Sequence, residues 1–387
     1  MTLSHVLTGV ALMQSHPAGQ IDSIVRSGVL DGVYPSAVVV VGTSDSVLLK
    51  RGIGSMTWEP GNPPDPDSTL YDLASLTKVV ATASGLLVLV DQGAISLDAP
   101  LATYVPDFRG RDKERVTVRH VLTHRSGLRA FLPLHTSTTD ATSARHRVVT
   151  EELRWPVGSR VEYSDLNSML AGWAIEQASG QRLSDFVRDA VFDPLGMTRT
   201  QYGVPVEDRR WAAPINLWRG HPISGVVHDQ NAERFGGVSG HAGVYSTGMD
   251  VARLSQWYLR RGRTAEGIQL VSGSVMDEFT TRGDRNRALG WEMKDPSSAD
   301  NSGELLAARS FGHTGFTGTS VWIDPSQDVF VVLLTNRVMA PRHPRSIAAL
   351  KGIRGQVADA AVRLRWYACR IEQMVSEDRV CVDGPAR

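Results

Sequence analysis

Strand-like segments lie near both ends of this 387-residue chain, and the long interval between them has mainly helical periodicity. Continuous or alternating apolar residues predict strands at 36–41 and 46–52, and again at 288–293, 319–323 and 329–335. The simplest arrangement that uses both groups is one antiparallel sheet with a mostly helical lobe inserted between its strands. The chain is therefore predicted to be an α+β protein.

The predicted helices divide the chain into two lobes. They cover residues 19–30, 72–91, 118–123, 165–178, 183–191, 249–260, 274–281 and 344–375. We predict a discontinuous sheet lobe of residues 1–70 and 285–375, flanked by the terminal helices, a mainly helical lobe of residues 71–284, and a frayed tail of residues 376–387. A ligand site is expected at the seam between the lobes.

Charge and composition exclude several classes of partner. Lys plus Arg equals Asp plus Glu, at 41 each, so no net field would attract nucleic acid or an anionic membrane, and we expect neither. The apolar runs are too short to span a bilayer. The N-terminal segment has no basic residues before its apolar part, and Cys369 and Cys381 are expected to be reduced thiols, so a cytoplasmic location is predicted. No zinc-site spacing, phosphate loop or dinucleotide fingerprint occurs, and no metal or cofactor is expected.

One lysine stands out in the stretch D-L-A-S-L-T-K-V-V-A-T-A-S-G-L-L-V-L-V-D, residues 72–91. Lys78 is one of only five lysines, and no other charged side chain lies between it and Asp91. Ser75 precedes it by three residues, so the two side chains share a helix face. Burial would lower the pKa of the lysine, and a lysine that can release its proton could activate the serine as a nucleophile. The simpler alternative is a serine that only caps a helix.

Two further motifs strengthen the catalytic interpretation: P-V-G-S-R-V-E-Y-S-D-L-N at 156–167 and F-G-H-T-G-F-T-G-T-S at 311–320. Together with S-L-T-K they resemble, in order and spacing, the three signature elements of the serine beta-lactamase and penicillin-binding-protein superfamily. The resemblance is to the branch of class C beta-lactamases, D,D-peptidases, esterases and transacylases, whose second element is Tyr-x-Asn and whose third is Lys/His-Thr-Gly. It covers roughly residues 20–365.

The resemblance implies roles for individual residues. Ser75 would be the nucleophile and Lys78 its partner in proton transfer, with Tyr163 as the second candidate base. His313 would line the pocket opposite the nucleophile, and the backbone N–H groups of Ser75 and Phe316 would form the oxyanion hole. The remaining residues assigned to substrate binding are Asp165, Asn167, His241, Thr314 and Gly315. His241 could equally be an ordinary loop histidine.

The chain departs from the family pattern at position 165, and the choice of histidine at position 313 also bears on the substrate. Asp165 stands where the pattern has asparagine, and a carboxylate cannot donate a hydrogen bond to a substrate carbonyl. A carboxylate near Lys78 would favour its ammonium form, and so a relay centred on Tyr163, although it would also disfavour a phenolate. Asn167 could take the amide role, but two residues along a helix it would point elsewhere. His313 replaces the lysine that beta-lactam binders often use to bind the substrate carboxylate.

Three functions remain open from the sequence. The first is an enzyme that forms an acyl-enzyme from a small ester, thioester or amide and passes the acyl group to water, as an esterase or amidase, or to an amine or alcohol, as transacylases of secondary metabolism do. The second is a beta-lactamase or D,D-peptidase. The third is a catalytically inactive binding protein on the same fold. The sequence does not choose the donor, the acceptor or the oligomeric state.

Overall fold

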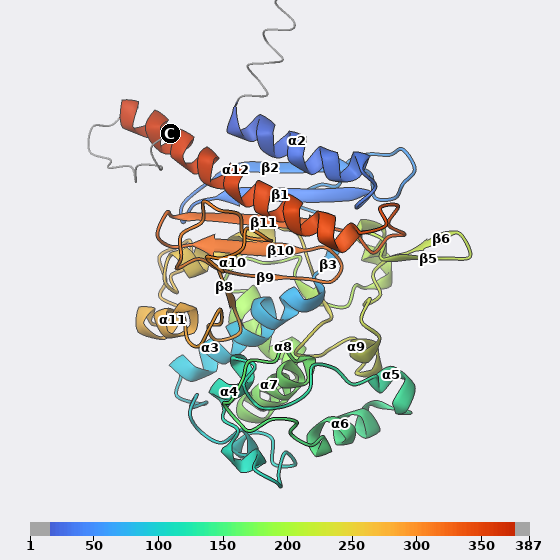
Figure 1. The fold of residues 1–387 in the computed structure, drawn as a ribbon, viewed down its shortest axis with the longest axis vertical. Coiled ribbons are helices and arrows are strands. Elements are labelled where there is room, and N and C mark those ends of the chain that lie inside the picture. Colours follow the sequence, from blue (N-terminus) through green and yellow to red (C-terminus); the bar gives the residue numbers. More distant parts are fainter. Residues whose placement is uncertain (1–15, 376–387) are drawn as a thin grey trace, which may run out of the picture.

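A six-stranded antiparallel sheet, built from both ends of the chain, forms the upper half of the computed structural model, which describes residues 16–375 (Figure 1). The strand order is β2–β1–β11–β10–β9–β8, so β1 and β11, from opposite ends of the chain, are direct neighbours. This confirms the predicted fold class. The strands are β1 (Ser36–Gly42), β2 (Val47–Gly54), β8 (Glu292–Met293), β9 (Phe311–Thr314), β10 (Ser320–Asp324) and β11 (Val329–Thr335).

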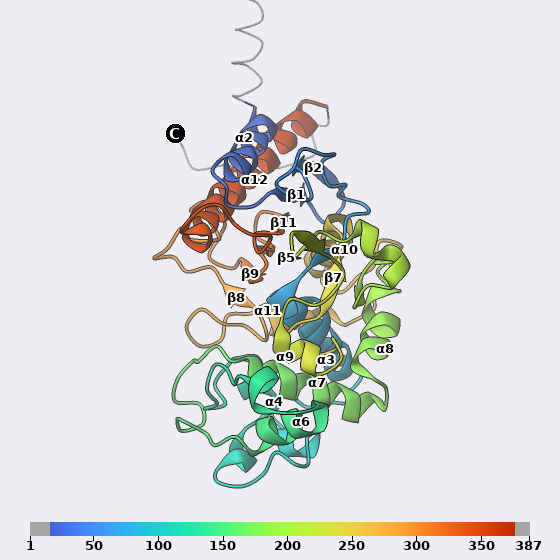
Figure 2. The same ribbon diagram turned by 90° about the vertical axis from the view of Figure 1, so that its right-hand side faces the viewer.

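Helices cover both faces of this sheet. The terminal helices α2 (Pro17–Leu30) and α12 (Ser346–Val375) lie side by side on its outer face (Figures 1 and 2). On the inner face, α10 (Gly248–Leu259) packs against β1, β10 and β11. Successive side chains of a strand point to opposite faces, and every residue of β1 is buried. That explains the unbroken V-V-V-V run in β1: Val38 and Val40 enter the core shared with the helical lobe, and the alternate residues enter the core beneath α2 and α12.

The helical lobe lies below the sheet (Figure 1). Its predicted helices form within a few residues of their expected ends, whereas three short helices between 134 and 234 were not predicted. The helices of this region are α3 (Ser84–Asp91), α4 (Val118–Leu122), α5 (Leu134–Ser137), α6 (Ala141–Thr150), α7 (Asp165–Ser179), α8 (Leu183–Val187), α9 (Gln230–Arg234) and α11 (Gly273–Thr280).

Short strands outside the main sheet were also missed from the sequence. The first strand of a three-stranded sheet of order β3–β7–β4 comes just before the S-L-T-K motif, and a two-stranded hairpin projects from the body (Figure 1). Two- and three-residue strands are too short for a periodic signal. They are β3 (Tyr71–Asp72), β4 (Gln201–Tyr202), β5 (Asn216–Trp218), β6 (His221–Ile223) and β7 (Val244–Ser246).

The segment that carries the S-L-T-K motif is a buried helical run. It begins with the 3₁₀ turn Ala74–Leu76, continues as the π-helical turn Lys78–Ala83 and ends as α3. By length and composition alone residues 74–91 could cross a membrane, with a mean hydropathy of 1.5. However, 83% of this window is buried inside the protein, which is typical of a core helix. The segment packs against α7, α8 and α11.

Two sequence predictions need correction. The strand expected at 288–293 is reduced to β8, because Gly290 has a positive φ of 85° and donates its N–H to the Leu122 carbonyl instead of a neighbouring strand. Cys369 is disulfide-bonded, so the expectation of two reduced thiols is wrong. Disulfides persist mainly in oxidising compartments, so one ground for a cytoplasmic location is lost. Residues 1–15 and the predicted tail, with Cys381, lie outside the described residues.

Candidate active site

Ser75 and Lys78 meet as the sequence predicted. Lys78 Nζ donates a hydrogen bond of 2.8 Å to Ser75 Oγ, and the lysine side chain is only 2% exposed. Ser75 itself is partly exposed, so a reactant can reach its hydroxyl. The pair therefore combines an accessible hydroxyl with a buried charged partner.

The turn before Ser75 has an unusual backbone conformation. Ala74 has φ of 47°, in the left-handed region that alanine rarely adopts. Asp72 Oδ1 accepts a hydrogen bond of 2.8 Å from the Ala74 N–H, and the loop after β9 supports the same turn. There Thr317 Oγ1 donates to the Asp72 carbonyl at 2.7 Å, and Thr319 Oγ1 donates to the Leu73 carbonyl at 2.9 Å. The surrounding structure thus holds a strained turn that presents Ser75.

Asp165 decides the charge of Lys78. Its carboxylate lies 2.8 Å from Lys78 Nζ, at the first residue of α7, and the lysine also donates to the His241 carbonyl at 3.2 Å. Burial lowers the pKa of Lys78, but Asp165 and the Tyr163 side chain outweigh burial and raise it above its ordinary value. Lys78 is therefore an ammonium at neutral pH, and Asp165 serves as its counter-ion.

Asp165→Asn is expected to lower the free energy of unfolding by about 3 kcal/mol at pH 7, because it leaves a buried ammonium without its counter-ion. The pKa of Lys78 is raised, so the pair stabilises the folded state fully below pH 10.5 and loses this effect as the pH rises further. Urea denaturation of both proteins between pH 7 and 11 measures the difference.

The matched control is Asp67→Asn, which removes the carboxylate of the exposed Lys50–Asp67 pair at 2.6 Å. Exposed pairs contribute less than about 1 kcal/mol, so this variant should remain close to the wild type. Equal, small losses in both variants would mean that Asp165 does not balance a buried charge.

Tyr163 lies among four cationic or aromatic groups. Lys78 Nζ is 5.0 Å and Arg287 Cζ is 5.4 Å from the centre of its ring. Its ring also contacts those of His124 and His313, at centroid distances of 4.8 and 5.9 Å. His124 fixes the start of α7 through Nδ1, which accepts from the Ser164 N–H at 3.2 Å. Tyr163 is thus held beside two positive charges.

His313 is a neutral side chain in this cleft. It lies on β9 and is buried, and burial together with Lys78 and Arg287 lowers its pKa well below the ordinary value. With the ring neutral, its Nδ1–H donates to the Thr314 carbonyl at 3.0 Å, so Nε2 carries the lone pair. His313 therefore provides a hydrogen-bond acceptor but not a fixed positive charge.

Gly315 and Phe316 form the wall opposite the nucleophile. A Cβ at Gly315 would lie 2.4 Å from the Leu73 carbonyl oxygen, so only glycine permits this close approach. The Phe316 carbonyl accepts from Arg337, and its N–H has no hydrogen-bond partner among residues 16–375. That leaves the Phe316 N–H available to an oxyanion. Its role stays a prediction.

Two predicted substrate-binding side chains are engaged elsewhere. Asn167 is 1% exposed, and its Oδ1 accepts from Ser126 Oγ at 2.6 Å, away from the cleft. The His241 ring is also buried: Nε2 lies 3.0 Å from Asp229 Oδ1, and Nδ1 lies 2.8 Å from Ser239 Oγ. Only its backbone carbonyl reaches the candidate site, through Lys78.

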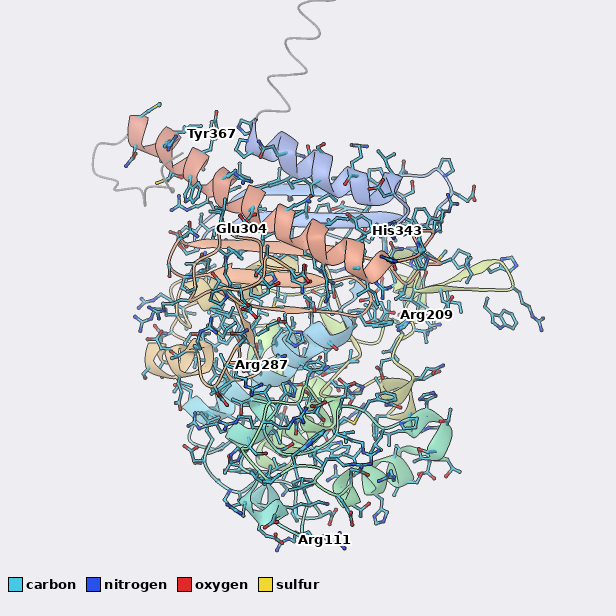
Figure 3. The ribbon with its side chains drawn as sticks, in the orientation of Figure 1. Arg111, Arg209, Arg287, Glu304, His343 and Tyr367 are labelled. Carbon is cyan, nitrogen blue, oxygen red and sulfur yellow. The ribbon has the colours of Figure 1, made fainter. Side chains whose placement is uncertain are left out.

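A cleft of about 340 Å³ opens over Ser75. Several arginines that the sequence did not predict as site residues line it. Within the described part of the chain, four basic residues of its lining make no ion pair. Burial and the neighbouring Arg337 lower the pKa of Arg354 to about 9, and its Nε has no partner. Figure 3 labels Arg287 at the level between the sheet and the helical lobe. The four are Arg287, Arg337, Lys351 and Arg354; the lining also contains Ser75, Tyr163, Glu292, His313, Thr314, Gly315 and Phe316.

No motif of the sequence identified these arginines as site residues. A faint signal exists for Arg354, which is 7% exposed and lies among apolar positions of α12. An arginine on the apolar face of a helix must find polar partners, and here it donates to the carbonyls of Gly315 and Thr319. Across residues 16–375, no group of three or more His, Cys, Asp or Glu side chains is arranged to hold a metal ion.

Known proteins resemble this chain over most of its length. A family model described as Beta-lactamase matches residues 21–352. A putative D-alanyl-D-alanine carboxypeptidase of Escherichia coli (strain K12) is 28% identical over 351 residues, which cover 81% of this chain and 80% of that protein.

Solved structures share the fold at lower identity. A penicillin-binding protein homologue from Caulobacter crescentus superposes with a TM-score of 0.72 at 21% identity, covering 90% of this chain and 97% of the other. EstCE1, described as a hydrolase with promiscuous acyltransferase activity, has a TM-score of 0.71 at 20% identity and covers 88% of this chain and 98% of the other.

Proposed function

This chain belongs to the beta-lactamase family, and from that premise we propose that it is a serine acyl-transfer enzyme acting on a small ester, thioester or amide. The observation that carries the proposal is the 2.8 Å hydrogen bond from a buried, charged Lys78 to the accessible hydroxyl of Ser75. An ammonium next to this oxygen stabilises the negative charge that develops there during attack. A serine that merely capped a helix would have no use for such a partner.

The proposed chemistry has two halves. Ser75 Oγ bonds to the substrate carbonyl carbon, and the carbonyl oxygen becomes an oxyanion facing the N–H groups of Ser75 and Phe316. Lys78 is already protonated and donates to Ser75 Oγ, so we assign Tyr163 the serine proton. Tyr163 accepts this proton on its phenolic oxygen while it gives its own phenolic proton to the leaving group, whose bond to the carbonyl carbon breaks as the acyl-enzyme forms. A second nucleophile then attacks the ester, returns its proton along the same path and releases Ser75.

The identity of the second nucleophile separates two versions of the proposal. Water would make the protein an esterase or amidase, and an amine or alcohol would make it a transacylase. EstCE1, which shares the fold, is described as a hydrolase with promiscuous acyltransferase activity. One scaffold of this kind is compatible with both outcomes, because exclusion of water and the shape of the acceptor site decide between them.

A second candidate function, D,D-peptidase or beta-lactamase, gains support from the arginines of the cleft. The replacement of the usual lysine by His313 counted against a carboxylate-bearing substrate. Arg337 and Arg354 provide positive charge from other elements, within the same cleft. The relative from Escherichia coli is named a putative D-alanyl-D-alanine carboxypeptidase, an activity whose substrate ends in a carboxylate.

Intact-mass spectrometry tests these candidates together. The protein is first mixed with a fluorophosphonate, which should add one phosphonyl group that peptide mapping places on Ser75. It is then mixed with neutral esters, with a peptide ending in D-Ala-D-Ala and with nitrocefin, each with and without an amine. An adduct discharged faster by amine indicates a transacylase, and one discharged equally fast without amine indicates a hydrolase. Preference for the peptide or nitrocefin supports the second candidate. No labelling at all would favour an inactive binding protein.

A further inference from the structure

We propose that Asp72 is a positioning residue: its carboxylate holds the nucleophile turn and the 226–229 loop together, so that its ionisation controls how well Ser75 is presented. This inference rests on the proposed function, since it assumes that Ser75 is the nucleophile. No signature motif of the sequence includes Asp72. The proposal comes from the contacts of its two carboxylate oxygens.

Each oxygen of Asp72 holds a different segment. Oδ1 accepts from the Ala74 N–H at 2.8 Å, and Oδ2 accepts from the His228 N–H at 2.7 Å. The first bond fixes the left-handed Ala74 immediately before Ser75. The second fixes a loop that is distant in sequence. An ionised carboxylate suits this task because it accepts on both oxygens and donates on neither.

The loop that Asp72 holds reaches both sides of the candidate site. The His228 ring contacts the Phe316 ring, with centroids 5.5 Å apart, next to the proposed oxyanion N–H. The following residue, Asp229, bonds the His241 ring at 3.0 Å, and the His241 carbonyl accepts from Lys78. One carboxylate thus connects the nucleophile turn with the supports of Phe316 and Lys78.

Keeping Asp72 ionised opposes folding, which points to a role other than stability. Burial and, to a smaller extent, the nearby Asp229 raise its pKa to about 6, against the lowering effect of its two backbone hydrogen bonds. A raised carboxyl pKa means that the folded state favours the neutral acid, so ionisation above pH 6 destabilises the fold.

The groups that face Asp72 do not supply a compensating charge. Burial lowers the pKa of His228, which disfavours a positive charge on its ring. Tyr245, paired with Asp72 across β3 and β7, has its pKa raised well above 10 by burial and then by Asp72. Asp229 is ionised, because its bond to His241 overcomes burial and lowers its pKa. Asp72 is therefore the group of this cluster expected to titrate near pH 6.

Protonation should loosen the nucleophile turn. The oxygen that gains the proton becomes a weaker acceptor, so either the Ala74 or the His228 bond weakens. A displacement of the order of 1 Å at a reacting group can reduce a rate about a hundredfold. The acylation rate of Ser75 should accordingly fall about tenfold between pH 7 and pH 5, following a group with a pKa of about 6.

The test compares fluorophosphonate labelling of the wild type and Asp72→Asn from pH 4.5 to 8.5, by intact mass. An amide can accept from one N–H but presents its own NH₂ to the other, so it mimics the protonated acid. The variant should label about ten- to a hundredfold more slowly than the wild type at pH 7.5 and lack the decrease near pH 6. Labelling at the wild-type rate, or with the wild-type pH profile, would overturn the inference.

Thr317→Val provides the matched control, because it removes another support of the turn but leaves the carboxylate in place. It should label more slowly at every pH and retain the decrease near pH 6. If Asp72→Asn does not fold, the wild type and this control decide. A labelling rate that does not change between pH 5 and pH 7 in either protein contradicts the proposal. If the wild type is never labelled on Ser75, the proposed function itself is rejected. Asp72 would then have no nucleophile to position.

Discussion

Ser75→Ala is expected to reduce acyl-enzyme formation by at least about four orders of magnitude, to the background of non-specific labelling. The substitution removes the oxygen that Lys78 contacts and that is proposed to form the covalent bond. Folding should be retained, because Ser75 is partly exposed and alanine suits the short 3₁₀ turn. The measurement is the fluorophosphonate adduct by intact mass, together with ester turnover.

Ser84→Ala is the matched control for this experiment. Ser84 lies nine residues further along the same buried run, where its hydroxyl donates to the Val79 carbonyl at 2.8 Å and lies 3.1 Å from the Tyr258 hydroxyl. Its loss should lower the free energy of unfolding by about 1 kcal/mol and leave labelling unchanged. An adduct that still forms in Ser75→Ala would show that another residue is the nucleophile, and it would refute the proposed chemistry.

Lys78→Met is expected to slow acylation about a thousandfold while the protein still folds. Methionine fills the volume of the buried lysine stem but can neither donate to Ser75 Oγ nor stabilise negative charge there. The side chain of Asp165 is 20% exposed, so its carboxylate can recover some hydration when the ammonium is gone. The rate of fluorophosphonate labelling at pH 7.5 measures the effect.

Lys113→Met is the corresponding control, since Lys113 is another buried lysine. It is 4% exposed, donates to the Val149 carbonyl at 2.7 Å and lies over the Phe108 ring, outside the lining of the cleft. Its replacement should affect stability but not labelling. If both variants were labelled as fast as the wild type, Lys78 would have only a structural role.

The main sheet was predictable because its longer strands carry clear patterns. The buried runs of β1 and β11 are unmistakable, whereas β9, with the sequence F-G-H-T, is not among the strands predicted from the patterns. A four-residue strand with a central glycine has no periodic signal of its own. The strand predicted at 288–293 failed for the opposite reason: its pattern suits a strand, but the Gly290 turn is fixed by a tertiary contact with Leu122.

The site was predictable where chemistry depends on local spacing. Ser75 and Lys78 are three residues apart, and their contact follows from helix geometry. The arginines of the cleft could not be found in this way. Arg337 follows β11 and Arg354 lies on α12, where it bonds the loop between β9 and β10, so only tertiary packing brings the two to the same opening as Ser75. Asp72 was missed because the importance of its carboxylate depends on a loop more than 150 residues away.

The neighbouring positions of β1 and β11 also determine when the protein can assemble. Separating two strands by most of the chain adds little to the free-energy cost of loop closure, which grows only logarithmically with length, but it slows folding. During synthesis β1 and β2 emerge early, while β11 emerges near the end, so β1 has one unpaired edge until then. His313 on β9, and Gly315 directly after it, are also synthesised late. A partly synthesised chain would therefore contain Ser75 and Lys78 without the opposite wall of the cleft, and catalytic competence would come only with the final segment.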